Sequence, residues 1–149
     1  MVGIDIVAIA RIERILARSG ESFLRRFLNK REISLCVGEN GNFNAQRIAG
    51  FYAAKEAIAK ALGCGISKHL AFKDIRLRKN SQGAPKAKLS KRTKKHFGVK
   101  KIALSISHDK DKIRAKNTRN LRDFKGDSCA KNAIKSQGFA IAIAIIKRK

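Results

Sequence analysis

The chain has 149 residues, so it is long enough to bury one core and too short for two domains of ordinary size. A hydrophobic content of 44% excludes a chain that is disordered throughout. Thirty-five Lys and Arg residues against eleven Asp and Glu residues give a formal net charge of +24 at pH 7. Such a charge indicates a nucleic acid, a phosphate-rich ligand or an acidic protein as partner, unless it only reflects a preference for Lys in the proteome.

The cysteines and the apolar segments indicate the cellular compartment of the protein. Cys36, Cys64 and Cys129 are scattered and form neither a disulfide framework nor a Cys-x-x-Cys metal clip. We expect Cys36 and Cys64 to be small apolar core residues in a reducing compartment. The first residues carry no basic leader, and the apolar run 139–146 is too short to cross a bilayer as a helix. The sequence therefore predicts a cytoplasmic protein without membrane insertion.

The first predicted element is a short strand over 1–7, which is apolar apart from Asp5. A helix follows, and its apolar residues repeat with a helical period that faces the core: Ile9, Ile12, Ile15 and Leu16. Arginines at i, i+3 and i+7 line a different face of this helix: Arg11, Arg14 and Arg18. A solvated helix face is the ordinary explanation of such a stripe, and a docking surface is the alternative.

Further helices are predicted before the hydrophobic period changes. Short helical pieces over about 23–35 pack beneath the first helix, and 38–44 is a turn-rich polar break. A long helix then runs from about residue 44 to residue 62, where Gly63 stops it. On this helix Glu56 precedes Lys60 by four residues, which is the favourable order for an ion pair.

Alternation with a period of two predicts strands in the second half of the chain. Strands around 75–77 and 87–89 flank a turn at 80–85, and Ser90 caps a short Lys-rich helix that ends near Phe97. These segments add a hairpin and a small helix to the predicted fold.

Two more strands complete the fold. A strand over 102–107 delivers His108 at its tip. The last strand, 139–146, alternates large and small apolar residues, so both of its faces look buried and we infer a subunit interface. Between these strands, 110–137 is rich in Lys and Arg and predicts a solvated insertion. We therefore expect a single α+β domain over 1–149, with an antiparallel sheet packed on a long central helix.

Asp5 and Glu56 are the candidate metal ligands. A carboxylate is costly to bury unless it is paired or bound to a metal, and Glu56 lies among alanines in the long helix. Two hard oxygen ligands with open positions suit Mg²⁺, which completes its octahedron with water and substrate phosphates. From spacing alone, Asp5 could instead cap its strand, and Glu56 could simply pair with Lys60.

Six motifs, in order, resemble those of the holo-acyl-carrier-protein synthases. They are Gly3-Ile4-Asp5-Ile6-Val7 with Arg11-Ile12, the segment from Arg26 to Ile33, the segment from Ile48 to Gly63 with Ala53-Ala54-Lys55-Glu56-Ala57, Gly83-Ala84-Pro85, Ser105-Ile106-Ser107-His108-Asp109 and Phe139-Ala140-Ile141-Ala142. Each motif alone is common, but their shared order covers the chain apart from the basic insertion.

The resemblance implies a magnesium-dependent 4'-phosphopantetheinyl transferase that modifies a serine of apo-acyl-carrier protein for fatty acid biosynthesis. Coenzyme A is the donor, and adenosine 3',5'-bisphosphate leaves. Asp5 and Glu56 would hold the Mg²⁺ ion, and Glu56 would act as general base through a metal-held water. Lys60 would offset phosphate charge as a second catalytic residue. Residues expected to bind coenzyme A are Lys55, Lys60, Pro85 and His108.

The resemblance also implies partners. Carrier proteins of this family are acidic around the modified serine, so Arg11, Arg14 and Arg18 would dock one. Family members form homotrimers with active sites between subunits, which agrees with the doubly apolar last strand. One departure is Phe51, because many relatives carry Arg there; Arg47 on a nearby turn could substitute for it.

Two other functions compete with this reading. The charge alone suggests a nucleic-acid-binding protein, but Tyr52 lies in a helix of small residues and no zinc-finger, P-loop or RRM pattern is present. We therefore expect no nucleic acid partner. A carrier-binding relative without catalysis is the second alternative, and the joint presence of Asp5, Glu56 and Lys60 argues against it.

Overall fold

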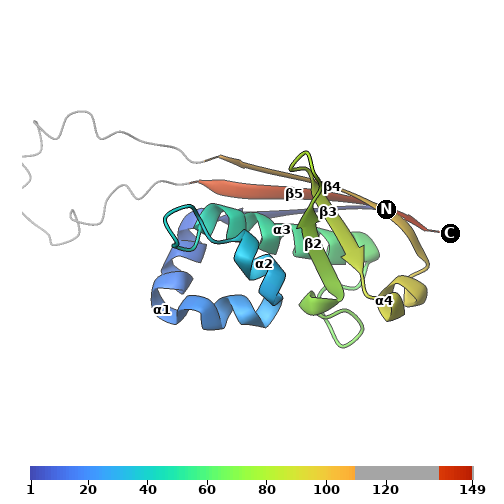
Figure 1. The fold of residues 1–149 in the computed structure, drawn as a ribbon. Coiled ribbons are helices and arrows are strands. Elements are labelled where there is room, and N and C mark those ends of the chain that lie inside the picture. Colours follow the sequence, from blue (N-terminus) through green and yellow to red (C-terminus); the bar gives the residue numbers. More distant parts are fainter. Residues whose placement is uncertain (110–137, 149) are drawn as a thin grey trace, which may run out of the picture.

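Residues 1–109 and 138–148 are described here in a computed structural model (Figure 1). A three-stranded sheet lies on one side of the long helix α3, and α1, α2 and a separate hairpin pack on its other side. In chain order the elements are β1 (Val2–Ala8), α1 (Ile9–Phe27), α2 (Lys30–Leu35), α3 (Ala45–Leu62), the 3-10 turn η1 (Phe72–Asp74), β2 (Ile75–Lys79), β3 (Pro85–Leu89), α4 (Lys91–His96), β4 (Val99–Asp109) and β5 (Phe139–Arg148). The predicted α+β class is confirmed, and the predicted insertion 110–137 lies outside the described residues.

The sheet brings the two ends of the chain together. Its strand order is β1-β5-β4, both pairings are antiparallel, and the last strand lies in the centre. Asp5 of β1 and Ile106 of β4 are both paired with Ala142 of β5. This register aligns the carboxylate of the first predicted motif with the strand that carries His108.

Small residues let α3 lie close to the sheet. Ala140, Ala142 and Ala144 of β5 are fully buried against the helix side of the sheet. A Cβ atom added to Gly3 would lie 2.1 Å from the Ala57 carbonyl oxygen, so only glycine permits this approach of β1 to α3. Because side chains alternate across a strand, Gly3, Asp5 and Val7 share the face that packs on α3.

The helix termini follow from local sequence signals. The side chain of Asn44 accepts a hydrogen bond from the Arg47 N–H at 3.0 Å, and Gly63 ends α3 in the left-handed region at φ 78°. Ser90 caps α4 in the same way by accepting from the Thr93 N–H. α1 includes a kink at Gly20, where φ is 50°, so its second part turns beneath the first. The predicted starts and stops of α3 and α4 are confirmed.

The outer face of the sheet is apolar and exposed in the single chain. We call it the isoleucine face; its members are Val2, Ile4, Ile6, Phe139, Ile141, Ile143 and Ile145. This face is open in the single chain, so the predicted burial of both faces of the last strand depends on the inferred subunit interface. Only the alanine side of β5 packs on α3, because the described elements supply no second layer over the isoleucine face.

The structure tests the predictions about the burial of the cysteines and about membrane-spanning helices. Cys36 is buried and free, and burial raises the pKa of its thiol to about 12, so it behaves as a core residue. Cys64 is free but only partly buried, so it borders the core rather than lying in it. None of the described helices is long and apolar enough to cross a membrane.

Candidate active site

Asp5 and Lys60 form the first contact of the candidate site. Asp5 points from β1 toward α3, and the Lys60 ammonium donates to its Oδ1 at 2.7 Å. The Asp5 side chain is 14% exposed and that of Lys60 is 52% exposed, so the pair lies at an opening to solvent. The hydrogen bond with Asp5 raises the pKa of the Lys60 ammonium, which therefore remains charged at neutral pH.

Glu56 lies one turn before Lys60 on α3 and is half-buried. Burial raises the pKa of the Glu56 carboxyl, and the neighbouring Asp5 charge raises it further, whereas Lys60 lowers it. The spacing of Glu56 and Lys60 suggested that these two residues form an ion pair. In the structure the Lys60 ammonium binds Asp5 instead. The structure thus brings Asp5, Glu56 and Lys60 together from two elements.

The chemistry of this cluster fits a divalent cation. The Asp5 charge raises the pKa of the Glu56 carboxyl, so a positive charge nearby favours the ionised form of Glu56, and Lys60 already supplies one such charge to Asp5. Within residues 1–109 and 138–148, no group of three or more His, Cys, Asp or Glu side chains could hold a metal ion. A cation held here by two carboxylates would complete its coordination with water and ligand phosphates, as Mg²⁺ commonly does in proteins.

Lys55 has a structural position instead of the expected ligand-binding one. Its side chain is fully buried, and its ammonium donates to the Phe27 carbonyl at 2.7 Å, to Glu32 at 3.0 Å and to the Phe72 carbonyl at 3.1 Å. Burial lowers the pKa of Lys55, and the Glu32 carboxylate opposes that shift. Binding of coenzyme A by Lys55 does not fit this position, because all three donor hydrogens are used inside the protein.

Glu32 is the residue that the sequence reasoning missed. Its carboxylate is fully buried and accepts from the N–H groups of Asn29 and Leu77 as well as from Lys55. This group ties α2, α3 and β2 together beside the carbonyls of Phe27 and Phe72. The Asn-x-x-Glu capping box at 29–32 was the available sequence signal for the local half of this network.

His108 lies on the same face of the sheet as Asp5, two residues beyond the Ile106 position that aligns with it. The separation along the strand is about 7 Å. The His108 ring is exposed, and its Nδ1 lies 2.7 Å from Nε2 of Gln46 at the start of α3. Gln46 therefore holds the orientation of His108 while leaving the other ring nitrogen for a ligand.

Three other predicted or substitute positions lie on β3 and on the first half of α3. Pro85 opens β3, where it pairs with Lys79 and is half-buried. Phe51 is 7% exposed and belongs to the core. The Arg47 guanidinium donates to the Val37 carbonyl at 3.0 Å, so it braces the loop before α3. The structure does not gather these residues around Asp5 within the chain.

The predicted arginine stripe lies on the exposed surface of α1. Arg11, Arg14 and Arg18 are all exposed and line one shallow hollow together with Glu13. Ile9 and Ile12 are buried on the opposite side of the helix, as the period predicted, whereas Ile15 is only half-buried. The stripe directly follows β1, so it begins close to the Asp5 strand.

Comparisons with known proteins identify the family to which this fold belongs. A model described as the 4'-phosphopantetheinyl transferase superfamily matches residues 1–144. The chain is 50% identical over 110 residues to the holo-[acyl-carrier-protein] synthase of Wolinella succinogenes, covering 74% of this chain and 88% of that protein. It is 47% identical over 109 residues to the enzyme of the same name from Helicobacter pylori, covering 73% and 87%.

Solved structures agree as well. The crystal structure of Helicobacter pylori holo-[acyl-carrier-protein] synthase in complex with coenzyme A matches with a TM-score of 0.75 and 38% identity, over 99% of this chain and 100% of that one. The family model and the matching fold thus place the chain among the phosphopantetheinyl transferases. Within that class, the chain belongs to the holo-[acyl-carrier-protein] synthase family.

Proposed function

We propose that the protein transfers the 4'-phosphopantetheine group from coenzyme A to a serine of an apo-acyl-carrier protein. The cluster of Asp5, Glu56 and Lys60 carries this proposal, because it joins two carboxylates and a cation at a solvent opening. Family membership and the coenzyme A complex of the Helicobacter pylori relative support the substrate. The reaction yields holo-acyl-carrier protein for fatty acid biosynthesis, and we expect it in the cytoplasm.

The reaction replaces a phosphoanhydride bond of coenzyme A with a phosphoester bond to the serine. The serine hydroxyl oxygen attacks the phosphorus next to the pantetheine and forms the new P–O bond. The bond from that phosphorus to the bridging oxygen breaks, and adenosine 3',5'-bisphosphate leaves with the electron pair. The serine proton must pass to a base, and the chain must offset the charge that develops on the phosphates.

The residues of the site have complementary roles in this step. Glu56 is the base in our proposal, since a half-buried carboxylate with a raised pKa accepts a proton more readily than an exposed one. Lys60, charged and half-exposed beside it, faces the phosphates and stabilises the leaving group. Asp5 and Glu56 would hold Mg²⁺, which when bound supplies Lewis-acid polarisation of the pyrophosphate.

Substrate binding extends from this cluster. We assign His108, held by Gln46, to the nucleotide end of coenzyme A, and we keep Pro85 as a coenzyme A-binding residue. The exposed arginine stripe on α1 is assigned to the acidic carrier protein, where it contributes orientation and association rate.

Intact-mass measurement of an apo-acyl-carrier protein tests the function directly. Incubation with the protein, coenzyme A and magnesium should add one phosphopantetheine to the carrier. Removal of magnesium with a chelator should abolish the gain, since two protein carboxylates alone leave the pyrophosphate charge unneutralised. Absence of any gain with several apo carriers would point to a silent relative and contradict the proposal.

The isoleucine face supports assembly into a homotrimer with active sites between subunits. Four members of this face on β5 are 37–51% exposed, and a large apolar patch of this kind marks an interface. We expect Ile143→Glu, at the centre of the face, to dissociate the assembly, as measured by light scattering coupled to gel filtration. Lys94→Glu on exposed α4 is the matched charge control. A monomeric wild-type protein would refute the trimer.

A further inference from the structure

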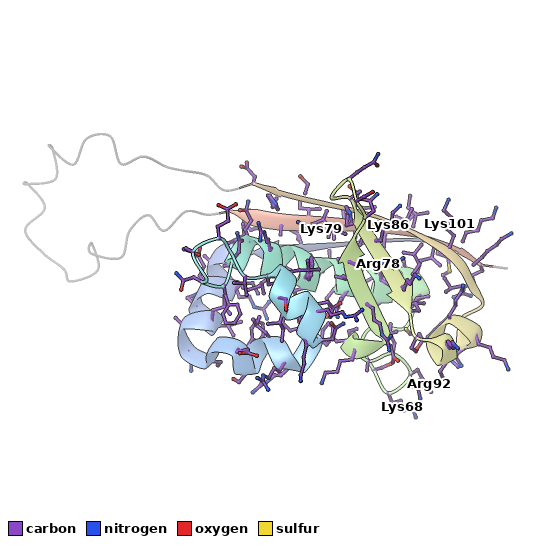
Figure 2. All side chains as sticks on the ribbon, viewed as in Figure 1. Lys68, Arg78, Lys79, Lys86, Arg92 and Lys101 are labelled. Atoms are coloured by element: carbon purple, nitrogen blue, oxygen red, sulfur yellow. The ribbon has the colours of Figure 1, made fainter. Side chains whose placement is uncertain are left out.

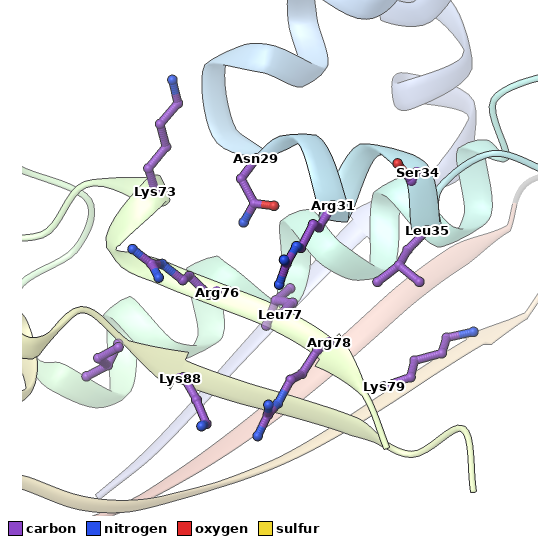
Figure 3. Close-up of a pocket in the computed structure, with 11 residues that line it drawn as sticks. Asn29, Arg31, Ser34, Leu35, Lys73, Arg76, Leu77, Arg78, Lys79 and Lys88 are labelled. Carbon is purple, nitrogen blue, oxygen red and sulfur yellow. The ribbon is translucent and has the colours of Figure 1, made fainter. Parts of the chain in front are cut away.

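A second hollow lies away from the Asp5 cluster, between α2 and the β2–β3 hairpin (Figure 3). Its volume is about 850 Å³, within the range of ligand-binding pockets. We call it the basic groove. Six of its lining residues are cationic and none is acidic: Arg31, Lys73, Arg76, Arg78, Lys79 and Lys88. The site residues Asp5, Glu56 and Lys60 do not line it, so transfer chemistry gives no reason for this charge.

The hairpin places like charges directly opposite each other. Arg76 pairs with Lys88 and Arg78 pairs with Lys86 across β2 and β3, and all four side chains are exposed. Cross-strand pairs of like charge destabilise a sheet. In Figure 2, Arg78, Lys79 and Lys86 gather at the turn end of the hairpin. This arrangement therefore costs stability unless an anion binds there.

No described carboxylate neutralises these cations. The ion pairs of the described residues include Arg25–Glu21, Lys55–Glu32, Lys60–Asp5 and Arg92–Asp74. None of them involves a lining residue of the basic groove. The positive charge of this surface is therefore available to an external partner.

The interior of the groove is apolar. Leu35 of α2, Leu77 of β2 and Leu89 of β3 also line it, and Leu77 is largely buried. Figure 3 shows Arg31 and Leu35 extending from α2 toward β2, where Leu77 lies. A partner that fills this hollow would bind more tightly if its apolar side chains contacted the leucines and its acidic side chains contacted the cationic rim. None of the lining residues is aromatic, so nucleobases would find no stacking platform.

We propose that the basic groove binds an acidic amphipathic segment of a partner protein. Its apolar side chains contact Leu35, Leu77 and Leu89, and its carboxylates bind the arginines of β2. Arginine forms bidentate contacts with carboxylates, which suits Arg76 and Arg78 at this rim. The site is separate from the arginine stripe on α1, and the inference does not depend on the transferase activity.

The test is binding of a fluorescently labelled synthetic peptide, measured by anisotropy. The peptide carries Leu at i, i+3, i+4 and i+7 and Glu elsewhere, and the paired probe has the same composition in scrambled order. Wild-type protein should bind the amphipathic peptide more tightly than the scrambled one. The double variant Arg76→Glu with Arg78→Glu should weaken binding by about tenfold or more. The double variant Lys94→Glu with Lys95→Glu on α4 makes the same change of charge outside the groove. It should leave the affinity for the amphipathic peptide unchanged.

Several outcomes would overturn the proposal. Equal binding of both peptides, or equal losses in the groove and control variants, would reduce the effect to non-specific attraction. Tighter binding of a single-stranded oligonucleotide that the groove variant abolishes would assign the surface to nucleic acid. A raised KM for apo-acyl-carrier protein in the groove variant would make the groove part of carrier docking. Misfolding is checked by urea unfolding, because the variant replaces repulsive cross-strand pairs with attractive ones and should be no less stable.

Discussion

Glu56→Gln is expected to lower phosphopantetheine transfer by roughly 10²- to 10⁴-fold, the range associated with loss of a general base. The substitution keeps the shape of the side chain and removes its charge and basicity. Glu56 also sits beside Asp5, so the neutral amide would weaken any cation held by the two carboxylates. The measurement is the rate of carrier modification at saturating coenzyme A and magnesium.

Two variants separate chemistry from folding. Glu39→Gln alters an exposed loop carboxylate and should leave the rate unchanged. Asp5→Asn should lower the rate while raising the magnesium concentration needed for half-maximal activity, because it removes one of the two candidate ligands. Full magnesium-dependent activity of Glu56→Gln, with unfolding equal to wild type, would exclude Glu56 from catalysis and require another base.

Glu32→Ala is expected to lower the free energy of unfolding by about 3–5 kcal/mol, as for other broken buried ion pairs. The loss leaves the Lys55 ammonium buried with only the carbonyls of Phe27 and Phe72, and it orphans the N–H groups of Asn29 and Leu77. Urea unfolding followed by circular dichroism measures the change.

The exposed pair Arg25–Glu21 supplies the matched comparison. Its two side chains are 70% and 45% exposed, so Glu21→Ala should cost no more than about 1 kcal/mol. A cost of Glu32→Ala as small as that of Glu21→Ala would mean that the buried pair does not stabilise the fold. Folded Lys55→Met protein should keep the wild-type KM for coenzyme A, which separates the structural position of Lys55 from a ligand-binding one.

Local and periodic features of this chain were readable without coordinates. Asn44 and Gly63 bound α3 because a side-chain acceptor and a left-handed glycine act within one helical turn. The strands β2 and β3 followed from alternation, and the six ordered motifs indicated the family that the comparisons confirm. The candidate cluster was found in part for the same reason, since its residues lie within those motifs.

Contacts between distant segments were not readable in this way. The sequence suggested Lys60 as the partner of Glu56 four residues away, but the ammonium binds Asp5, 55 residues distant. It also left Lys55 available to a ligand, whereas the structure buries it against Glu32. Likewise, the alternation of β5 predicted two apolar faces, but only the structure shows which face packs on α3 and which is open in the single chain.

The sequence by itself thus determined the elements, the family and the residue types of the site, because periodicity, capping and motif order are properties of neighbouring residues. Only the tertiary structure decided that Lys60 pairs with Asp5 and Lys55 with Glu32, because these ion pairs depend on how β1 and α2 pack against α3. It also decided that α2 and the β2–β3 hairpin enclose a cationic groove. The physical reason is that burial and ion pairing depend on distance in space, which is set only when separate elements pack together.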